Sequence, residues 1–177
     1  MAMATKVMAQ LRKFLDDREW KYLQDGPEIL RGLANGDNNQ WHWNAQCCAN
    51  GSFLGFYAYC PQRVPPHRLT AVAEYLTRAN FGLLFGKFEM NWPEGQVRLH
   101  TVVPILPSGV SVKAMEHLVH FNGLLMDRYL PGLLAVAIGG AVPEVAIRAA
   151  EPEDSSPTVP AAEPDQGRMG RLFSNDN

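Results

Sequence analysis

Two histidines, His117 and His120, have the spacing of a metal-binding pair. They lie three residues apart in a stretch with helical periodicity, beside Glu116. That spacing puts both imidazoles on roughly one face of a helix, as a metal pair requires. No third ligand is anchored nearby in the sequence, and two histidines fall short of a zinc site. We therefore expect ordinary helix residues here, with no bound metal and no cofactor.

The three cysteines are the next candidates for chemistry. Cys47 and Cys48 are adjacent, and neighbouring residues of a strand point to opposite faces, so they do not easily chelate one metal. Cys60 would need a base to act as a nucleophile, and the chain offers three further histidines: His42, His67 and His100. Nothing in the local sequence marks Cys60 as activated. A cysteine-dependent enzyme is therefore a distant alternative.

Nucleotide and hydrolase motifs are absent from the sequence. The spacing Gly82-x-x-x-Gly86 lacks the Gly-Lys-Ser/Thr that gives a P-loop its lysine and its magnesium ligand. No dinucleotide fingerprint, HExxH helix or GxSxG elbow occurs. The sequence predicts a protein that is not an enzyme.

The length and charge bound the organisation of the chain. Its 177 residues suffice for one full core but not for two comfortable domains. Residues 151–177 hold six acids and two arginines, a net charge of −4; because the whole chain carries −2, residues 1–150 carry +2. Neither part suggests the clustered basic face of a nucleic-acid-binding protein.

The sequence predicts a cytoplasmic location. The N-terminus does not have the arrangement of a signal peptide. The longest apolar stretch, Leu130–Val142, is interrupted by proline and glycine and is too short to cross a bilayer, so no membrane contact is expected. Three cysteines do not make a disulfide framework, which fits a reducing compartment.

Apolar periodicity and turn residues predict an α+β domain over residues 1–150. Helices are expected over Thr5–Arg18, after Pro65-Pro66, and from an N-cap at Ser111 to Pro131, which should bend or end the last one. Strands are expected at Ile29–Ala34, Gln40–Cys48, Ser52–Gln62, Leu84–Met90 and Gln96–Leu106. The order α-β-β-β-α-β-β-α favours an antiparallel sheet of about five strands with helices packed on it.

Aromatic residues are concentrated in the predicted meander: Trp41, Trp43, Phe56, Tyr57 and Tyr59. An aromatic sheet can stack nucleic-acid bases, but Gln40–Tyr59 contains no Lys or Arg, so nucleic acid is not expected. One face should pack under the helices. Large side chains left on the other face are typical of a protein interface, so we consider these five residues as candidates for binding.

The segment Arg78–Arg98 resembles the central motif of the YbjN family, whose members are labelled sensory transduction regulators. The matching positions are Asn80, Gly82, Gly86, Phe88, Glu89, Gly95, Val97 and Arg98, while Asn91 stands where the family often has Asp. The order of elements is similar from about Met8 to Leu134. The resemblance implies a fold similar to type III secretion chaperones, which dimerise and hold an unfolded stretch of another protein. It implies no enzyme activity and no catalytic residue to transfer.

From Glu151 the sequence is rich in proline and acids, which is typical of a disordered tail. The tail contains a basic and apolar cluster, of which Arg168, Arg171, Leu172 and Phe173 are candidate binding residues. It is either an inert linker or a tethered docking motif for a groove, including one on the domain itself.

Two function hypotheses of different classes follow. The leading one is a noncatalytic, chaperone-like adaptor or regulator that acts as a homodimer and binds a protein segment on its sheet. The alternative is a sensor in which a pocket binds a small metabolite.

Overall fold

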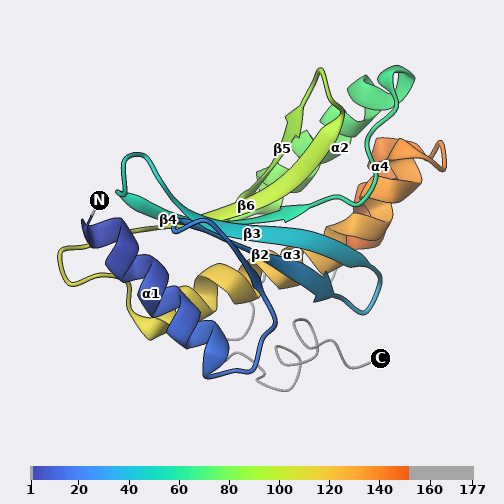
Figure 1. The fold of residues 1–177 in the computed structure, drawn as a ribbon. Helices are drawn as coiled ribbons and strands as arrows, with labels where there is room; N and C mark the ends of the chain where they lie inside the picture. Colours follow the sequence, from blue (N-terminus) through green and yellow to red (C-terminus); the bar gives the residue numbers. More distant parts are fainter. Residues whose placement is uncertain (1, 152–177) are drawn as a thin grey trace.

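The computed structural model describes residues 2–151 (Figure 1). In chain order the elements are α1 (Ala2–Asp16), β1 (Leu23–Asp25), β2 (Ile29–Asn35), β3 (Gln40–Cys48), β4 (Phe53–Tyr59), a short 3-10 helix η1 (Pro66–Arg68), α2 (Leu69–Gly82), β5 (Lys87–Asn91), β6 (Gln96–Pro104), α3 (Val112–Ala137) and α4 (Pro143–Ala150). The predicted α+β class and antiparallel sheet are confirmed. The sheet has a sixth strand, β1, and a fourth helix, α4, follows α3. The predicted tail lies outside the described residues except for Glu151.

The sheet has the strand order β1-β2-β3-β4-β6-β5 and is antiparallel throughout. Both predicted hairpin units are present: the meander β2-β3-β4 and the pair β5-β6. Strand β4 pairs with β6 and not with β5, because α2 carries the chain across to the edge. Strand β5 begins three residues later than expected, since Gly86 has a φ of +82° that ends the preceding turn.

The described helices all lie on one face of the sheet (Figure 1). Helix α3 packs on β4 and β6, α1 on β3, and α2 on β5, with α4 against α2 and α3. Of the helices in residues 2–151, none has the length and apolar character needed to cross a membrane. The molecule therefore has two layers, and the second face of the sheet carries no described helix.

Helix α3 starts as predicted but does not end at Pro131. The Ser111 side chain caps its first turn by accepting a hydrogen bond from the amide of Ala114 at 3.2 Å. Pro131 lies inside the helix, which continues to Ala137, and a proline there leaves the carbonyl of Asp127 without its usual helical donor. The Asn38 side chain from the β2–β3 loop donates to that carbonyl at 3.2 Å. The loop thus replaces the lost helical bond, so the helix tolerates the proline.

A double-mutant cycle tests whether the Asn38 side chain replaces the amide donor that Pro131 lacks. Replacing Asn38 with Ala removes this donor from a largely buried carbonyl, so we expect a loss of about 1–2 kcal/mol in the free energy of unfolding. In a Pro131→Ala background the new amide at 131 can pair with Asp127, and the same Asn38→Ala change should then cost much less. Chemical denaturation of the four proteins measures both effects, with Asn39→Ala as a control in the same loop. An equal cost of Asn38→Ala in both backgrounds would show that the two groups are not coupled.

Candidate binding surface on the open face of the sheet

The open sheet face is formed by residues that alternate with the core positions of the strands. The strand register places Tyr59 opposite Arg98 and Arg98 opposite Glu89. The next row places Tyr57 opposite His100. Polar and aromatic side chains therefore form adjacent rows across β4, β6 and β5.

Glu89 is the centre of a charged cluster on this face. Its carboxylate accepts hydrogen bonds from Arg98 Nη2 at 2.8 Å and Nε at 3.0 Å. Lys87 Nζ lies 2.9 Å and His100 Nδ1 3.1 Å from the same carboxylate. Partial burial alone would raise the pKa of Glu89, but the hydrogen bonds from Lys87, Arg98 and His100 outweigh it and lower the pKa to about 2. The carboxylate is ionised at neutral pH and fixes the three cationic or polar groups around it.

Tyr57 lies flat on the open sheet face because Gly55 leaves room for it. A methyl group at Gly55 would come within 2.8 Å of the Tyr57 ring, so the ring occupies the space that another side chain would fill. The Arg98 guanidinium lies 4.8 Å from the ring centre and the His100 ring 5.5 Å from it. These neighbours leave Tyr57 only 7% exposed, and this burial raises the pKa of its hydroxyl.

Tyr59 is the more accessible aromatic residue of this surface. It is half-buried, and its hydroxyl accepts a hydrogen bond from Asn44 Nδ2 at 3.0 Å. This bond fixes the ring on β4 next to β3. Tyr59 therefore presents a positioned ring edge to the solvent side of the sheet.

The remaining three candidate aromatics lie on the covered face. Trp41, Trp43 and Phe56 are each about 1% exposed, and Trp43 stacks on Phe56 with ring centres 4.9 Å apart. They form the core under α1 and α3, so of the five aromatic candidates only Tyr57 and Tyr59 lie on the open sheet face. The tail candidates Arg168, Arg171, Leu172 and Phe173 lie outside the described residues.

The cysteines and histidines do not assemble into a reactive site within residues 2–151. Cys60 is buried, and desolvation raises the pKa of its thiol to about 11. Cys47 faces α1, and burial raises its pKa as well. His120 is buried beside Phe121. No group of three possible metal ligands occurs among the described residues.

The residues of the family motif have structural roles at the β5 edge. The Asn80 side chain donates to the carbonyl of Phe88 at 3.0 Å and accepts from its amide at 2.7 Å, as a neighbouring strand would. Gly95 has a φ of +64° and lies so close to Val64 that a methyl group there would meet the Val64 carbonyl oxygen at 2.3 Å. The motif thus builds the β5–β6 hairpin and covers one edge of the sheet.

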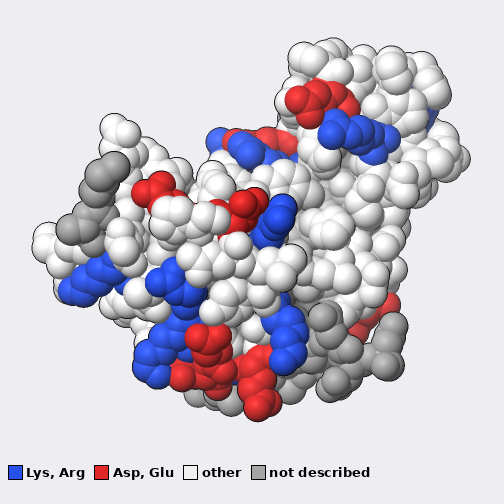
Figure 2. Space-filling model, viewed as in Figure 1, with Lys and Arg blue, Asp and Glu red and all other residues white. Residues whose placement is uncertain are grey.

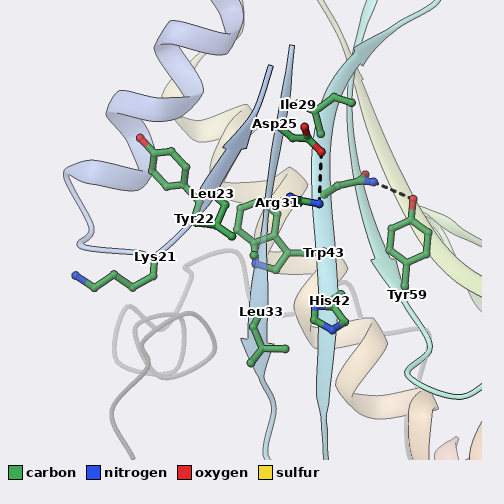
Figure 3. Close-up of a pocket in the computed structure, with 12 residues that line it drawn as sticks. Lys21, Tyr22, Leu23, Asp25, Ile29, Arg31, Leu33, His42, Trp43 and Tyr59 are labelled. Atoms are coloured by element: carbon green, nitrogen blue, oxygen red, sulfur yellow. Dashed lines mark hydrogen bonds and ion pairs between the residues drawn. The ribbon is translucent and has the colours of Figure 1, made fainter. Parts of the chain in front are cut away.

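A cavity of about 710 Å³ lies at the opposite edge, where β1 ends (Figure 3). Leu23, Leu33 and Trp43 supply apolar surface, and polar groups around them come from Lys21, Asp25, Arg31, His42, Asn44 and Tyr59. Sequence reasoning missed this cavity because it depends on β1, which is only three residues long. The sequence signal for it is the segment Trp20–Asp25 before Gly26-Pro27, which is expected from the sequence to form a bend or short strand and contains β1.

The Glu89 cluster predicts a specific dependence of stability on acid. The folded state lowers the pKa of Glu89 from its usual value of 4.5, so its contribution is complete above that value and is lost as the pH falls toward 2. Glu89→Gln should lower the free energy of unfolding by about 1 kcal/mol at neutral pH, given solvent screening, and have little effect near pH 2. Urea denaturation across this range measures the difference. Glu94→Gln, in the exposed pair with Arg63, is the control and should change little; parallel curves for Glu89→Gln and the wild type would contradict the cluster's role.

Comparison with known proteins agrees with this architecture. The crystal structure of YbjN, "a putative transcription regulator from E. coli", has a TM-score of 0.56 to this chain at 19% identity, covering 72% of this chain and 90% of the other. At that identity the likeness shows the fold alone. No curated protein matches the chain by sequence. A family model described as "Putative bacterial sensory transduction regulator" matches residues 8–135, which is most of the described domain, and the chain therefore belongs to the YbjN family.

Proposed function

We propose that this protein is a noncatalytic, chaperone-like adaptor or regulator of the bacterial cytoplasm, and that it acts as a homodimer which binds a segment of another protein. The open sheet face is the proposed contact surface. Tyr59 is the central aromatic contact and Tyr57 and Arg98 lie beside it. No nucleic acid, membrane or cofactor takes part in this function.

The observation that carries the proposal is the uncovered but ordered sheet face. The Glu89 carboxylate holds Arg98 and His100 in place, and Asn44 holds Tyr59, so the side chains lose little further freedom on binding. Interfaces are enriched in positioned tyrosine and arginine. On the open sheet face Lys87 and Arg98 pair with Glu89, and basic and acidic side chains are also mixed in the view of Figure 2. This mixture supports a protein partner over a polyanion.

The noncatalytic part of the proposal is supported by the state of the thiols and by the family description. Burial raises the pKa of the Cys60 thiol to about 11, so this thiol is protonated at neutral pH and is a weak nucleophile. The family description names regulation and no reaction. A regulator that acts by binding needs neither a reactive thiol nor a catalysed reaction, so it agrees with both observations.

A small-metabolite sensor is the second candidate function. A cavity of about 890 Å³ lies between α3, α4 and Asn38, and its mostly apolar lining includes the charged residues Asp127 and Arg128. Its size suits a small organic ligand. A thermal-shift screen against a metabolite panel tests it: a ligand that raises the melting temperature of the wild type but not of Arg128→Ala would favour the sensor, and a flat response would remove its support.

Photo-crosslinking in cells tests the proposed surface directly. A photoreactive amino acid at Tyr59 should give discrete adducts with a protein partner, identified by mass spectrometry. The same amino acid at Thr70, exposed on α2 in the helix layer, is the matched control and should give few. In an Arg98→Ala background the adducts at Tyr59 should weaken by about tenfold, since removal of an interface arginine costs about 1–2 kcal/mol. Equal labelling from both positions would contradict a contact surface on the open sheet face.

The dimer is tested by the mass in solution. The chain mass is 19.7 kDa, and the homodimer should have twice that mass by light scattering at micromolar concentration. A mass equal to that of one chain would remove the homodimer from the proposal.

A further inference from the structure

The outer edge of β2 is paired along only part of its length. Strand β1 pairs with Ile29–Arg31, and residues 32–34 have no strand partner on that side in the described part of the chain. The amide of Gly36 donates across the hairpin to the carbonyl of Asn39, so the even-numbered residues of β2 bond to β3. The amide and carbonyl of Leu33 therefore point outward from the sheet, where they can pair with an added strand.

The 710 Å³ cavity lies directly beside this unpaired edge (Figure 3). Because Gly32 has no side chain, the Trp43 indole packs against the β2 backbone; a methyl group at Gly32 would meet it at 2.6 Å. Leu33 of β2 and Leu23 of β1 add further apolar side chains to the lining of the cavity, and Leu23 is 66% exposed. An open strand edge with apolar pockets next to it takes an extended peptide with large apolar side chains.

We propose that Arg168–Phe173 of the same chain adds to the outer edge of β2 as a further strand, with the apolar side chains of one of its faces in the cavity. Met169 and Phe173 share a face of such a strand and supply those side chains, while Leu172 lies on the other face. The segment contains no proline, unlike the sequence before it. This docking does not rest on the proposed function, but the cavity shares Asn44 and Tyr59 with the proposed contact surface, so a docked tail and a partner segment would compete there.

The tail starts near the C-terminal end of β2, where the outer edge of that strand is unpaired. Arg128 Nε donates to the carbonyl of Ala150 at 2.7 Å, and the Tyr129 hydroxyl donates to Glu151, so the start of the tail is fixed. Ala150 and Asn38 line one cavity, and Asn38 lies in the loop that directly follows β2. Seventeen further residues lead from Glu151 to Arg168, a reach of up to about 55 Å, against a radius of gyration of about 15 Å for a domain of this size. Tethering therefore gives the segment a high effective concentration at the edge.

Amide hydrogen exchange of the full chain tests the docking. In the wild type the outward amide of Leu33 should exchange slowly, and in the double variant Leu172→Asp/Phe173→Asp it should exchange about tenfold faster or more. The amide of Trp43, paired inside the sheet, should be unchanged. The matched control is Val159→Asp/Ala161→Asp, which adds the same charge elsewhere in the tail and should exchange like the wild type. Thermal unfolding confirms that the domain is intact in each variant.

Three results would overturn the proposal. Equal exchange of Leu33 in the wild type and in Leu172→Asp/Phe173→Asp would show that the segment does not cover the edge. Equal acceleration by the control variant would assign the effect to tail charge and not to strand addition. Protection that increases with protein concentration and persists in Leu172→Asp/Phe173→Asp would assign the edge to a second copy of the domain.

Discussion

The buried amide of Asn122 fixes how the long helix α3 lies on the sheet. Its Nδ2 donates to the carbonyl of Phe56 at 3.1 Å, and the Thr101 hydroxyl next to it donates to the carbonyl of Leu118 at 2.9 Å. Asn122 and Thr101 are fully buried, and an unpaired donor in such a place costs about 1–3 kcal/mol. Apolar contacts alone would allow α3 to slide, whereas these bonds are satisfied in one position over β4 and β6.

The position of α3 determines the ends of the neighbouring elements. Pro131 comes opposite the β2–β3 loop, where Asn38 pairs with the freed carbonyl of Asp127. One turn further, the Arg68 side chain donates to the carbonyls of Val136 at 2.8 Å and Ala141 at 3.0 Å, which ties the end of the helix to the start of α2. The helices of residues 2–151 are thus collected on one face, and the open sheet face is a consequence of this one-sided packing.

Much of the fold follows from patterns that are local in the sequence. Alternation along the strands, the Asn-Gly turns and the Ser111 cap predict the meander, the second hairpin and the start of α3. Alternation predicts that Trp41, Trp43 and Ala45 share a face, and all three are buried. Which face the helices cover was not predictable, because Trp43 and Tyr57 both belong to aromatic strands and pack over glycines, Gly32 and Gly55, on opposite faces. The Glu89 cluster depends on the β5–β6 register, which places Glu89 opposite Arg98. Elements as short as β1 and α4 carry too few residues to show a period.

The two edges of the sheet differ in a way that bears on the role of the tail. Exposed strand edges invite unwanted pairing, and proteins usually cover or block them. At β5 the Asn80 side chain pairs with the amide and carbonyl of Phe88 and takes the place of a neighbouring strand. At β2 a three-residue strand covers only the first part of the edge, and an apolar cavity lies beside the remainder. A sheet that blocks one edge with a single side chain and leaves part of the other unpaired beside a cavity has one place where an added strand can pair with it.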